Sequence, residues 1–304
     1  SMAALKVDEP FIKSWKENGY RLDCNELVSA KALGVSKDYI SGIRNAGYPN
    51  ISYNQLISFK AQGITPEYIK GLRKAGKVEG KDKEGGLPSA EDVSSYKALN
   101  VDSAYIQGLK NAGYSNVPFN ELTSMKSLDI TPEYVKGFTD IGYKDIPANE
   151  LVSLKSLGVT PEYVKSFQNV GYKDISTNEL MSLKSLGITP EYVKGFEALG
   201  YKNISINELS SFRSLGVTSE YIRSFQAIGY KDIPSNDLTS LKSLGVTANF
   251  VKGFKDLGFT NISLNEATSL KATGVTPAYI SSMKAKGFNS KDLDKYIQLK
   301  NSFN

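Results

Sequence analysis

Apolar residues recur along the chain with a period of 29 residues. The segment 154–167, LKSLGVTPEYVKSF, returns almost unchanged at 183–196 and 241–254. Its branched residue after the turn recurs every 29 residues, with one gap of 37, at Val35, Ile64, Val101, Ile130, Val159, Ile188, Val217, Val246 and Val275. A fixed period in this range is typical of repeat proteins, in which each copy packs on its neighbours.

Each copy contains the pattern of two short amphipathic helices. The first is predicted to begin after Thr160, a favourable N-cap, with Pro161 at the first helical position. An apolar stripe of helical spacing follows, and a glycine suited to a left-handed backbone ends it: Tyr163, Val164, Phe167, Val170 and then Gly171. The pattern predicts a first helix of about three turns.

The second helix is predicted to begin at a capping box, which recurs as Ser176-x-x-Glu179, Ser205-x-x-Glu208 and Ser263-x-x-Glu266. The stripe Leu180, Leu183 and Leu186 is expected to face the core, and Gly187 is expected to end the helix. Helices this short are marginal alone in water, so the stacking of neighbouring copies must stabilise them.

The period therefore predicts an all-α fold, an α-solenoid or superhelix of about ten helix-turn-helix repeats. The whole chain, residues 1–304, is expected to form a single array. Three segments depart from the regular copies: a degenerate first repeat at 5–34 with Trp15 in the column of Phe167, a loop insertion at 77–89, and a C-terminal capping helix at 290–302. The apolar columns resume directly after the insertion, which favours a loop on one face of the array.

The amino-acid composition limits the catalytic and metal-binding chemistry that the chain can support. The chain has no His and one cysteine, Cys24, so it lacks the commonest general base near neutral pH and the commonest metal ligand. We expect no catalytic residues, no metal site, no cofactor and no enzymatic activity. No apolar run approaches the roughly 20 residues of a membrane helix, so no membrane span is expected. The opening residues Ser1 to Ala4 lack the apolar region of a signal peptide, which leaves the compartment open.

Basic residues also form columns. One column lies near the end of the second helix, where a cation complements the helix dipole: Lys126, Lys155, Lys184, Arg213, Lys242 and Lys271. The column in the middle of the first helix has no such role, and it supplies the candidate binding residues Lys165, Lys194, Arg223 and Lys252. Acidic columns match the basic ones nearly one for one, which favours a solvated face, while polyanion binding stays an alternative.

Aromatic and amide columns complete the pattern. The first-helix aromatic residues have core spacing, with their phenol oxygens expected at an edge or on a neighbouring backbone group. The loop tyrosines Tyr172, Tyr201 and Tyr230 are expected to be partly exposed, which makes them the better aromatic candidates for binding a partner. An asparagine column in the second helix is predicted to satisfy loop carbonyls of the adjacent copy: Asn25, Asn54, Asn120, Asn149, Asn178, Asn207, Asn236 and Asn265.

The segment 158–164, GVTPEYV, followed by a Gly-Tyr-x-x-Ile-x-x-Asn-Glu-Leu segment at 171–180, resembles the short helical repeats that follow the membrane-embedded peptidase part of BlaR-type metallopeptidases of Bacteroidetes. The His-Glu-x-x-His motif of that peptidase is absent here, so the resemblance implies the accessory repeats alone and no protease function. It also implies a bacterial interaction array in the periplasm or cell envelope.

These patterns together predict a non-catalytic scaffold that binds a protein or peptide through the solenoid surface. The alternative is a polyanion binder that uses the lysine columns, with an envelope polysaccharide or nucleic acid as ligand. Nucleic acid is the less expected partner, because the net charge of +5 is small for a dedicated nucleic-acid binder.

Overall fold

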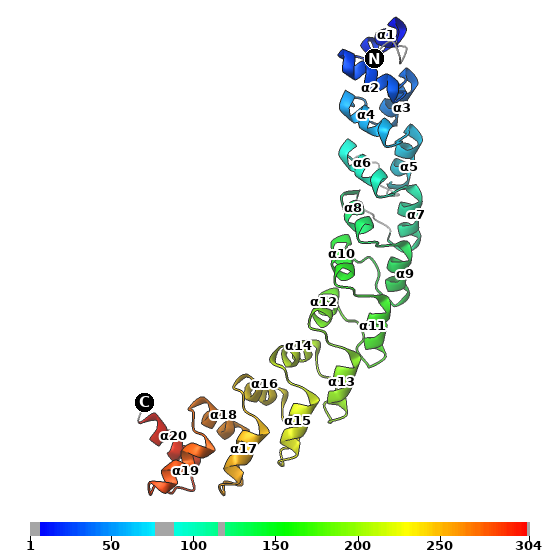
Figure 1. The fold of residues 1–304 in the computed structure, drawn as a ribbon. Helices are drawn as coiled ribbons and strands as arrows, with labels where there is room; N and C mark the ends of the chain where they lie inside the picture. Colours follow the sequence, from blue (N-terminus) through cyan, green and yellow to red (C-terminus); the bar gives the residue numbers. More distant parts are fainter. Residues whose placement is uncertain (1–6, 77–87, 115–118, 303–304) are drawn as a thin grey trace. The chain divides into compact units, whose positions relative to one another are not determined.

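The computed structural model describes residues 7–76, 88–114 and 119–302, and the described chain is all-helical. Twenty short helices follow one another in ten pairs and form an α-solenoid of repeats, as the period predicts (Figure 1). Each pair consists of an odd-numbered helix, which is the first helix of a copy, and an even-numbered helix, which is the second.

The chain divides into two compact units, Ser1–Tyr163 and Val164–Asn304. The first unit contains α1 (Glu9–Glu17), α2 (Cys24–Ala32), α3 (Lys37–Ala46), α4 (Tyr53–Ala61), α5 (Pro66–Gly76), α6 (Ala90–Ala98), α7 (Ser103–Asn111), α8 (Phe119–Ser127), α9 (Pro132–Asp140) and α10 (Ala148–Ser156). The boundary falls inside α11 (Pro161–Gln168). The continuity of one array across this boundary stays a prediction.

The second unit continues with α12 (Thr177–Ser185), α13 (Pro190–Glu197), α14 (Ile206–Leu215), α15 (Ser219–Gln226), α16 (Ser235–Ser243), α17 (Ala248–Lys255), α18 (Leu264–Ala272), α19 (Pro277–Ala285) and α20 (Leu293–Asn301). Within each unit the even-numbered helices pack on one another in one layer, for example α14 on α16 and α16 on α18. The odd-numbered helices form the other layer, as α3, α5 and α7 do in the first unit (Figure 1).

The helix ends follow the capping chemistry that the sequence predicts. The hydroxyl of Thr189 accepts a hydrogen bond from the Tyr192 N–H, and the Ser176 and Glu179 side chains form the reciprocal capping box of α12. At the other end of that helix, Gly187 has a φ of 61°, and the Ile188 N–H donates to the Leu183 carbonyl at 2.9 Å. This is the Schellman arrangement, which satisfies carbonyls that the helix leaves unpaired.

Two predicted helix lengths are wrong. The first helix of a regular copy has eight or nine residues, as in α13 and α9, and is therefore closer to two turns than three. Its last apolar residue before the glycine, such as Leu199, lies in a turn that bonds back to the helix. The C-terminal helix begins at Leu293 with Asp292 as its N-cap, three residues later than expected, because the Ser290 hydroxyl binds within the preceding loop.

The core lies between the two layers. Phe138, Phe167 and Phe196 are fully buried, as are the branched residues after each turn. Leu186 departs from the prediction, since it is the C-cap of α12 and stays partly exposed while Leu180 and Leu183 are buried.

The structure describes the degenerate first repeat but only part of the predicted insertion. Trp15 fills the core position that phenylalanine takes in later copies and is 1% exposed. Most of the predicted insertion at 77–89 lies outside the described residues. On either side of it, α5 packs directly against α7, and the Tyr48 hydroxyl donates to the Pro88 carbonyl at 2.5 Å. The stack of the first unit therefore continues past the insertion.

Candidate binding surface

The tyrosines of the odd-numbered helices tie each copy to the next. Their hydroxyls donate to the carbonyl of the branched residue 25 residues onward, at 2.7 Å from Tyr192 to Val217 and from Tyr221 to Val246. Tyr105 and Tyr134 make the same bond in the first unit. The prediction that the phenol oxygens reach neighbouring backbone groups is confirmed, and the column has a structural explanation.

The candidate loop tyrosines have a structural role as well. Tyr172, Tyr201 and Tyr230 are partly exposed, as predicted. Each hydroxyl donates to the isoleucine carbonyl that precedes the even-numbered helix of the following copy, at 2.5 to 2.7 Å. Burial raises the pKa of all three phenols, so they stay protonated donors at neutral pH. The hydroxyls are therefore not open to a partner, and the Nζ of Lys255 lies 4.6 Å from the centroid of the Tyr230 ring.

The cations near the ends of the even-numbered helices lie over aromatic rings of the odd-numbered helix in the same copy. The guanidinium of Arg213 is 5.3 Å from the Tyr192 ring centroid, and its Nε donates to the Leu186 carbonyl. Lys242 lies 4.5 Å from the Tyr221 ring, and Lys271 lies 5.0 Å from the Phe250 ring. These cation–π contacts explain why this column is basic without a ligand.

The candidate cations of the odd-numbered helices are all exposed. Lys252 binds Asp256 in its own helix at 2.8 Å, and Arg223 lies 4.0 Å from Glu220. Hydrogen bonds from its own backbone N–H and from the Thr189 side chain lower the pKa of Glu191, and the charge of Lys194 lowers it a little further. Such exposed pairs contribute little stability, so the structure assigns no packing role to Lys165, Lys194, Arg223 and Lys252. It leaves them accessible to a ligand.

The predicted asparagine bridge between copies is wrong. All eight asparagines of the column are exposed at the second position of their helices. In the described residues the column's side-chain contact is local, from Asn120 to Glu121 at 3.4 Å. The second position points outward from the stack, because the core of each even-numbered helix is built from the residues two and five positions later, Leu180 and Leu183 in α12.

Sequence reasoning missed an exposed leucine column. The large hydrophobic residues exposed in the described chain are Leu157, Leu215 and Leu244, at 40%, 39% and 41%. All three occupy the position directly before the turn glycine, as Leu186 does. The signal was present in the sequence, since Gln62 and Thr273 occupy the same column and show that it is not a core position.

A second missed feature lies in the loops. Asp145, Asp174, Asn203 and Asp232 have positive φ values between 51° and 55°. Aspartate and asparagine tolerate this left-handed conformation better than other side chains with a Cβ. The Lys-Asp-Ile loop sequence is therefore a turn requirement, and its acidic residue needs no partner.

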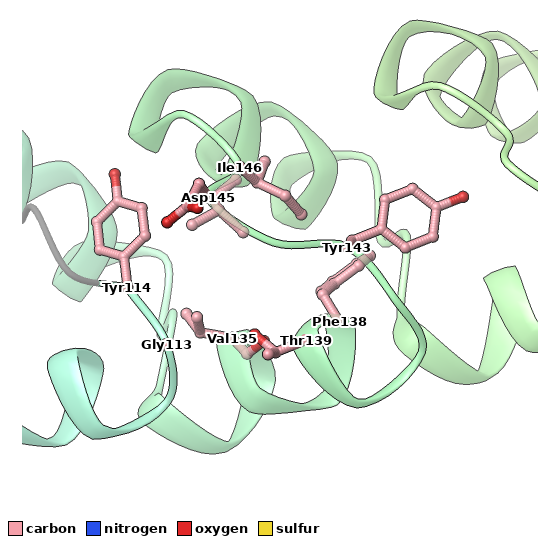
Figure 2. Close-up of a pocket in the computed structure, with 9 residues that line it drawn as sticks. Gly113, Tyr114, Val135, Phe138, Thr139, Tyr143, Asp145 and Ile146 are labelled. Carbon is pink, nitrogen blue, oxygen red and sulfur yellow. The ribbon is translucent and has the colours of Figure 1, made fainter.

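The cavity shown in Figure 2 is too small for a ligand. Val135, Phe138 and Thr139 of α9 line one side, and Asp145 and Ile146 of the following loop line the other. Its volume of about 10 Å³ has room for roughly one water molecule.

A larger and open hollow of about 570 Å³ lies near the C-terminal end of the second unit, between the 257–262 loop and the 289–293 loop. The two columns that fill this position in earlier copies change there: Lys291 replaces the buried isoleucine, and Phe259 replaces the tyrosine whose hydroxyl bridges the copies. The hollow is therefore explained as the place where the repeat pattern ends.

Charge distinguishes the units. Residues 1–163 carry 20 Lys and Arg and 20 Asp and Glu, whereas residues 164–304 carry 17 basic and 12 acidic residues. Within residues 7–76, 88–114 and 119–302, no cluster of three or more His, Cys, Asp and Glu could hold a metal ion. None of the helices in these ranges combines the length and apolar character needed to cross a bilayer.

No family model matches the sequence, and no curated protein matches it either. The resemblance to the accessory repeats of the BlaR-type peptidases stays a prediction.

Proposed function

We propose that this protein is a non-catalytic scaffold that binds a protein or peptide through the surface of its repeats. The observation that supports this proposal is that some columns of the repeat have packing roles and others do not. The phenol hydroxyls bond from one copy to the next and the even-helix cations pack on rings within a copy, while other columns repeat the same exposed chemistry at every copy. A row of equivalent exposed sites suits an extended ligand, which can contact several copies at once.

A second candidate is binding of a polyanion, and the excess of basic residues in the second unit favours it. Lys165, Lys194, Arg223 and Lys252 belong to that unit and lie exposed on successive odd-numbered helices. A sulfated or phosphorylated polymer would contact several of these cations, with an affinity that falls steeply as salt rises. In a bacterial envelope, as the resemblance implies, the ligand would be an anionic polysaccharide.

Charge reversal separates the two candidates. Replacing Lys165, Lys194, Arg223 and Lys252 together by Glu should leave the helical content intact, because the four side chains are exposed, and should abolish binding to heparin if the polyanion candidate is correct. The matched control reverses Lys70, Arg73, Lys136 and Lys144 in the first unit, which are also exposed. Heparin binding that is absent from the wild type, or equal in both variants, removes the polyanion candidate.

The scaffold proposal is tested with a display library of random peptides panned on the full chain. It predicts peptides that compete with one another for the repeat surface and whose affinity depends only weakly on salt. Failure to enrich any peptide, or enrichment that exposed-surface substitutions leave unchanged, would contradict it.

A further inference from the structure

We infer that the C-terminal ends of α12, α14, α16 and α18 form a docking ridge for an acidic peptide segment with regularly spaced apolar side chains. The inference rests on the proposed scaffold function and names the chemistry of its partner. The ridge consists of Leu186, Arg213, Leu215, Lys242, Leu244 and Lys271.

Leucines and cations alternate along this ridge. The Arg213 Nε donates to the carbonyl of Leu186 at 2.9 Å, which places this cation beside the leucine of the preceding copy. A Cβ added at Gly216, the neighbour of Leu215, would lie 3.6 Å from the Cε of Lys242. At Gly245, the neighbour of Leu244, the corresponding distance to the Cε of Lys271 is 3.9 Å. Each leucine therefore has the cation of the next copy at its side.

The leucines have no role in the stack that explains their size. Leu215 and Leu244 are 39% and 41% exposed, although neighbouring apolar columns are buried. Gln62 and Thr273 take the same position at the ends of α4 and α18, where each caps its helix through its backbone N–H as Leu244 caps α16. The helix end therefore accepts a polar side chain, and the leucine adds an apolar surface that only a partner would bury.

The cations are held in place before any partner arrives. Arg213, Lys242 and Lys271 lie over aromatic rings of the odd-numbered helix in the same copy at 4.5 to 5.3 Å. A side chain that is already ordered loses less conformational entropy when it binds a carboxylate. Fixed cations between exposed leucines select a ligand that alternates acidic and apolar groups, because a purely anionic polymer would leave the leucines in water.

The charge around the ridge becomes more positive toward its C-terminal end. Glu191 and Glu220 begin α13 and α15, but Asn249 and Ala278 take the same position in α17 and α19. The first turns of α17 and α19 contain no acidic residue. Repulsion of an acidic ligand is therefore weakest beside Leu244 and Lys271, where the complementarity to carboxylates is greatest.

The spacing of the copies fixes the register of the ligand. Packed helices lie roughly 8–10 Å apart, and a peptide in the polyproline II conformation advances about 9 Å in three residues, with every third side chain on the same face. The matching ligand is an extended segment with an apolar side chain at about every third residue and acidic residues between them.

The test uses a fluorescent peptide of about 12 residues with Leu at every third position and Glu elsewhere, which spans the four helices at this spacing in the polyproline II conformation. Its dissociation constant for the full chain is measured by fluorescence anisotropy. The double substitution Leu215→Gln and Leu244→Thr, which introduces residues that the column already accepts, should weaken binding by roughly tenfold or more. The control pair Leu33→Gln and Leu99→Gln in the first unit should change it less than twofold.

A second double substitution and two altered peptides complete the experiment. Arg213→Gln with Lys242→Gln should weaken binding about threefold and reduce its salt dependence, as expected for partly exposed charge pairs. The ridge proposal is wrong if the Leu215/Leu244 variant binds the peptide as tightly as the wild type does and has the same circular dichroism. If peptides with Lys for Glu or Ser for Leu bind as well as the probe, the ridge is wrong and the scaffold function stands. If none of these peptides and no library peptide binds, both proposals fail.

Discussion

The two units are built on the same internal contacts but differ at their surfaces. In the first unit, Tyr39 and Tyr68 donate to the carbonyls of Ile64 and Val101, and in the second unit Tyr192 makes the equivalent bond to Val217. The fully buried phenylalanines occupy equivalent positions in both. The first unit has balanced charge, an insertion and a degenerate first copy, whereas the second is regular and carries the basic excess.

The comparison shows which positions the stack requires. The first unit tolerates Asn100 and Asp129 where the other copies have a turn glycine, with φ values of 56° and 54°. It also tolerates a gap of 37 residues between branched positions. Neither change alters the tyrosine bonds or the buried column. Core contacts are therefore the invariant part of this array, and the surface columns are free to differ between units.

The largest expected effect is alkaline unfolding, which should occur at a different pH in each unit. Burial raises the pKa of Tyr68, Tyr192 and Tyr221 from 10.0 to about 12. Because the folded pKa lies above the unfolded value, the stabilisation is complete below pH 10 and is lost as the pH rises through 12. Four first-unit tyrosines donate in this way, Tyr39, Tyr68, Tyr105 and Tyr134, while Phe250 interrupts the column in the second.

We expect the first unit to unfold at the lower pH. The single tryptophan, Trp15, lies in the first unit and reports its unfolding by fluorescence, while ellipticity at 222 nm, the usual helix band, reports all helices. Loss of ellipticity before any change in Trp15 fluorescence would reverse the predicted order.

Truncation of the buried phenylalanines should affect both units alike. Phe138 in the first unit and Phe196 in the second are 1% and 0% exposed. Replacing either by Ala leaves a cavity in a close-packed core and should cost about 3–5 kcal/mol in the free energy of unfolding. Urea unfolding of the two variants gives the comparison. A difference of more than about 2 kcal/mol would show that one core is packed less tightly than the other.

A smaller effect is expected at the turn position where the units differ in sequence. Gly216 has a φ of 74°, and a Cβ added there meets only the flexible end of Lys242 at 3.6 Å. Gly216→Val should therefore cost roughly 1–2 kcal/mol through backbone strain alone. The reverse change in the first unit, Asp129→Gly, should be neutral or slightly stabilising. Thermal melts check both, and a destabilised Asp129→Gly protein would mean that the carboxylate has a role beyond the turn.

The smallest effect is expected from shortening the insertion. Removing residues 78–85 restores the period of 29 residues. The contacts on both sides, α5 on α7 and Tyr48 on Pro88, already have the regular geometry. The deletion should leave the ellipticity unchanged and shift Tm by no more than a few degrees. A large fall in Tm would show that these residues support the first unit.

The candidate site illustrates the limits of sequence reasoning. The mid-helix lysines and the loop tyrosines could be located by number, because each belongs to a column with a fixed offset from the turn glycine. Their partners could not, since the hydroxyl of Tyr201 meets a carbonyl 32 residues away. The asparagine column was misplaced for the same reason: regularity in sequence indicates that a position is equivalent in every copy, not that it faces a neighbour.

The sequence by itself determined the period, the two helices of each copy and their ends, because capping, turn formation and amphipathic spacing act over a few neighbouring residues. Only the tertiary structure decided which periodic columns meet across copies. It buried Leu183 and exposed Leu215, although both read as leucines of the same helix stripe. The sequence predicts that Arg213 complements the helix dipole, and the structure adds that its guanidinium lies over the ring of Tyr192. Contacts of this kind depend on the angle and distance between helices, which the local signals within one helix do not encode.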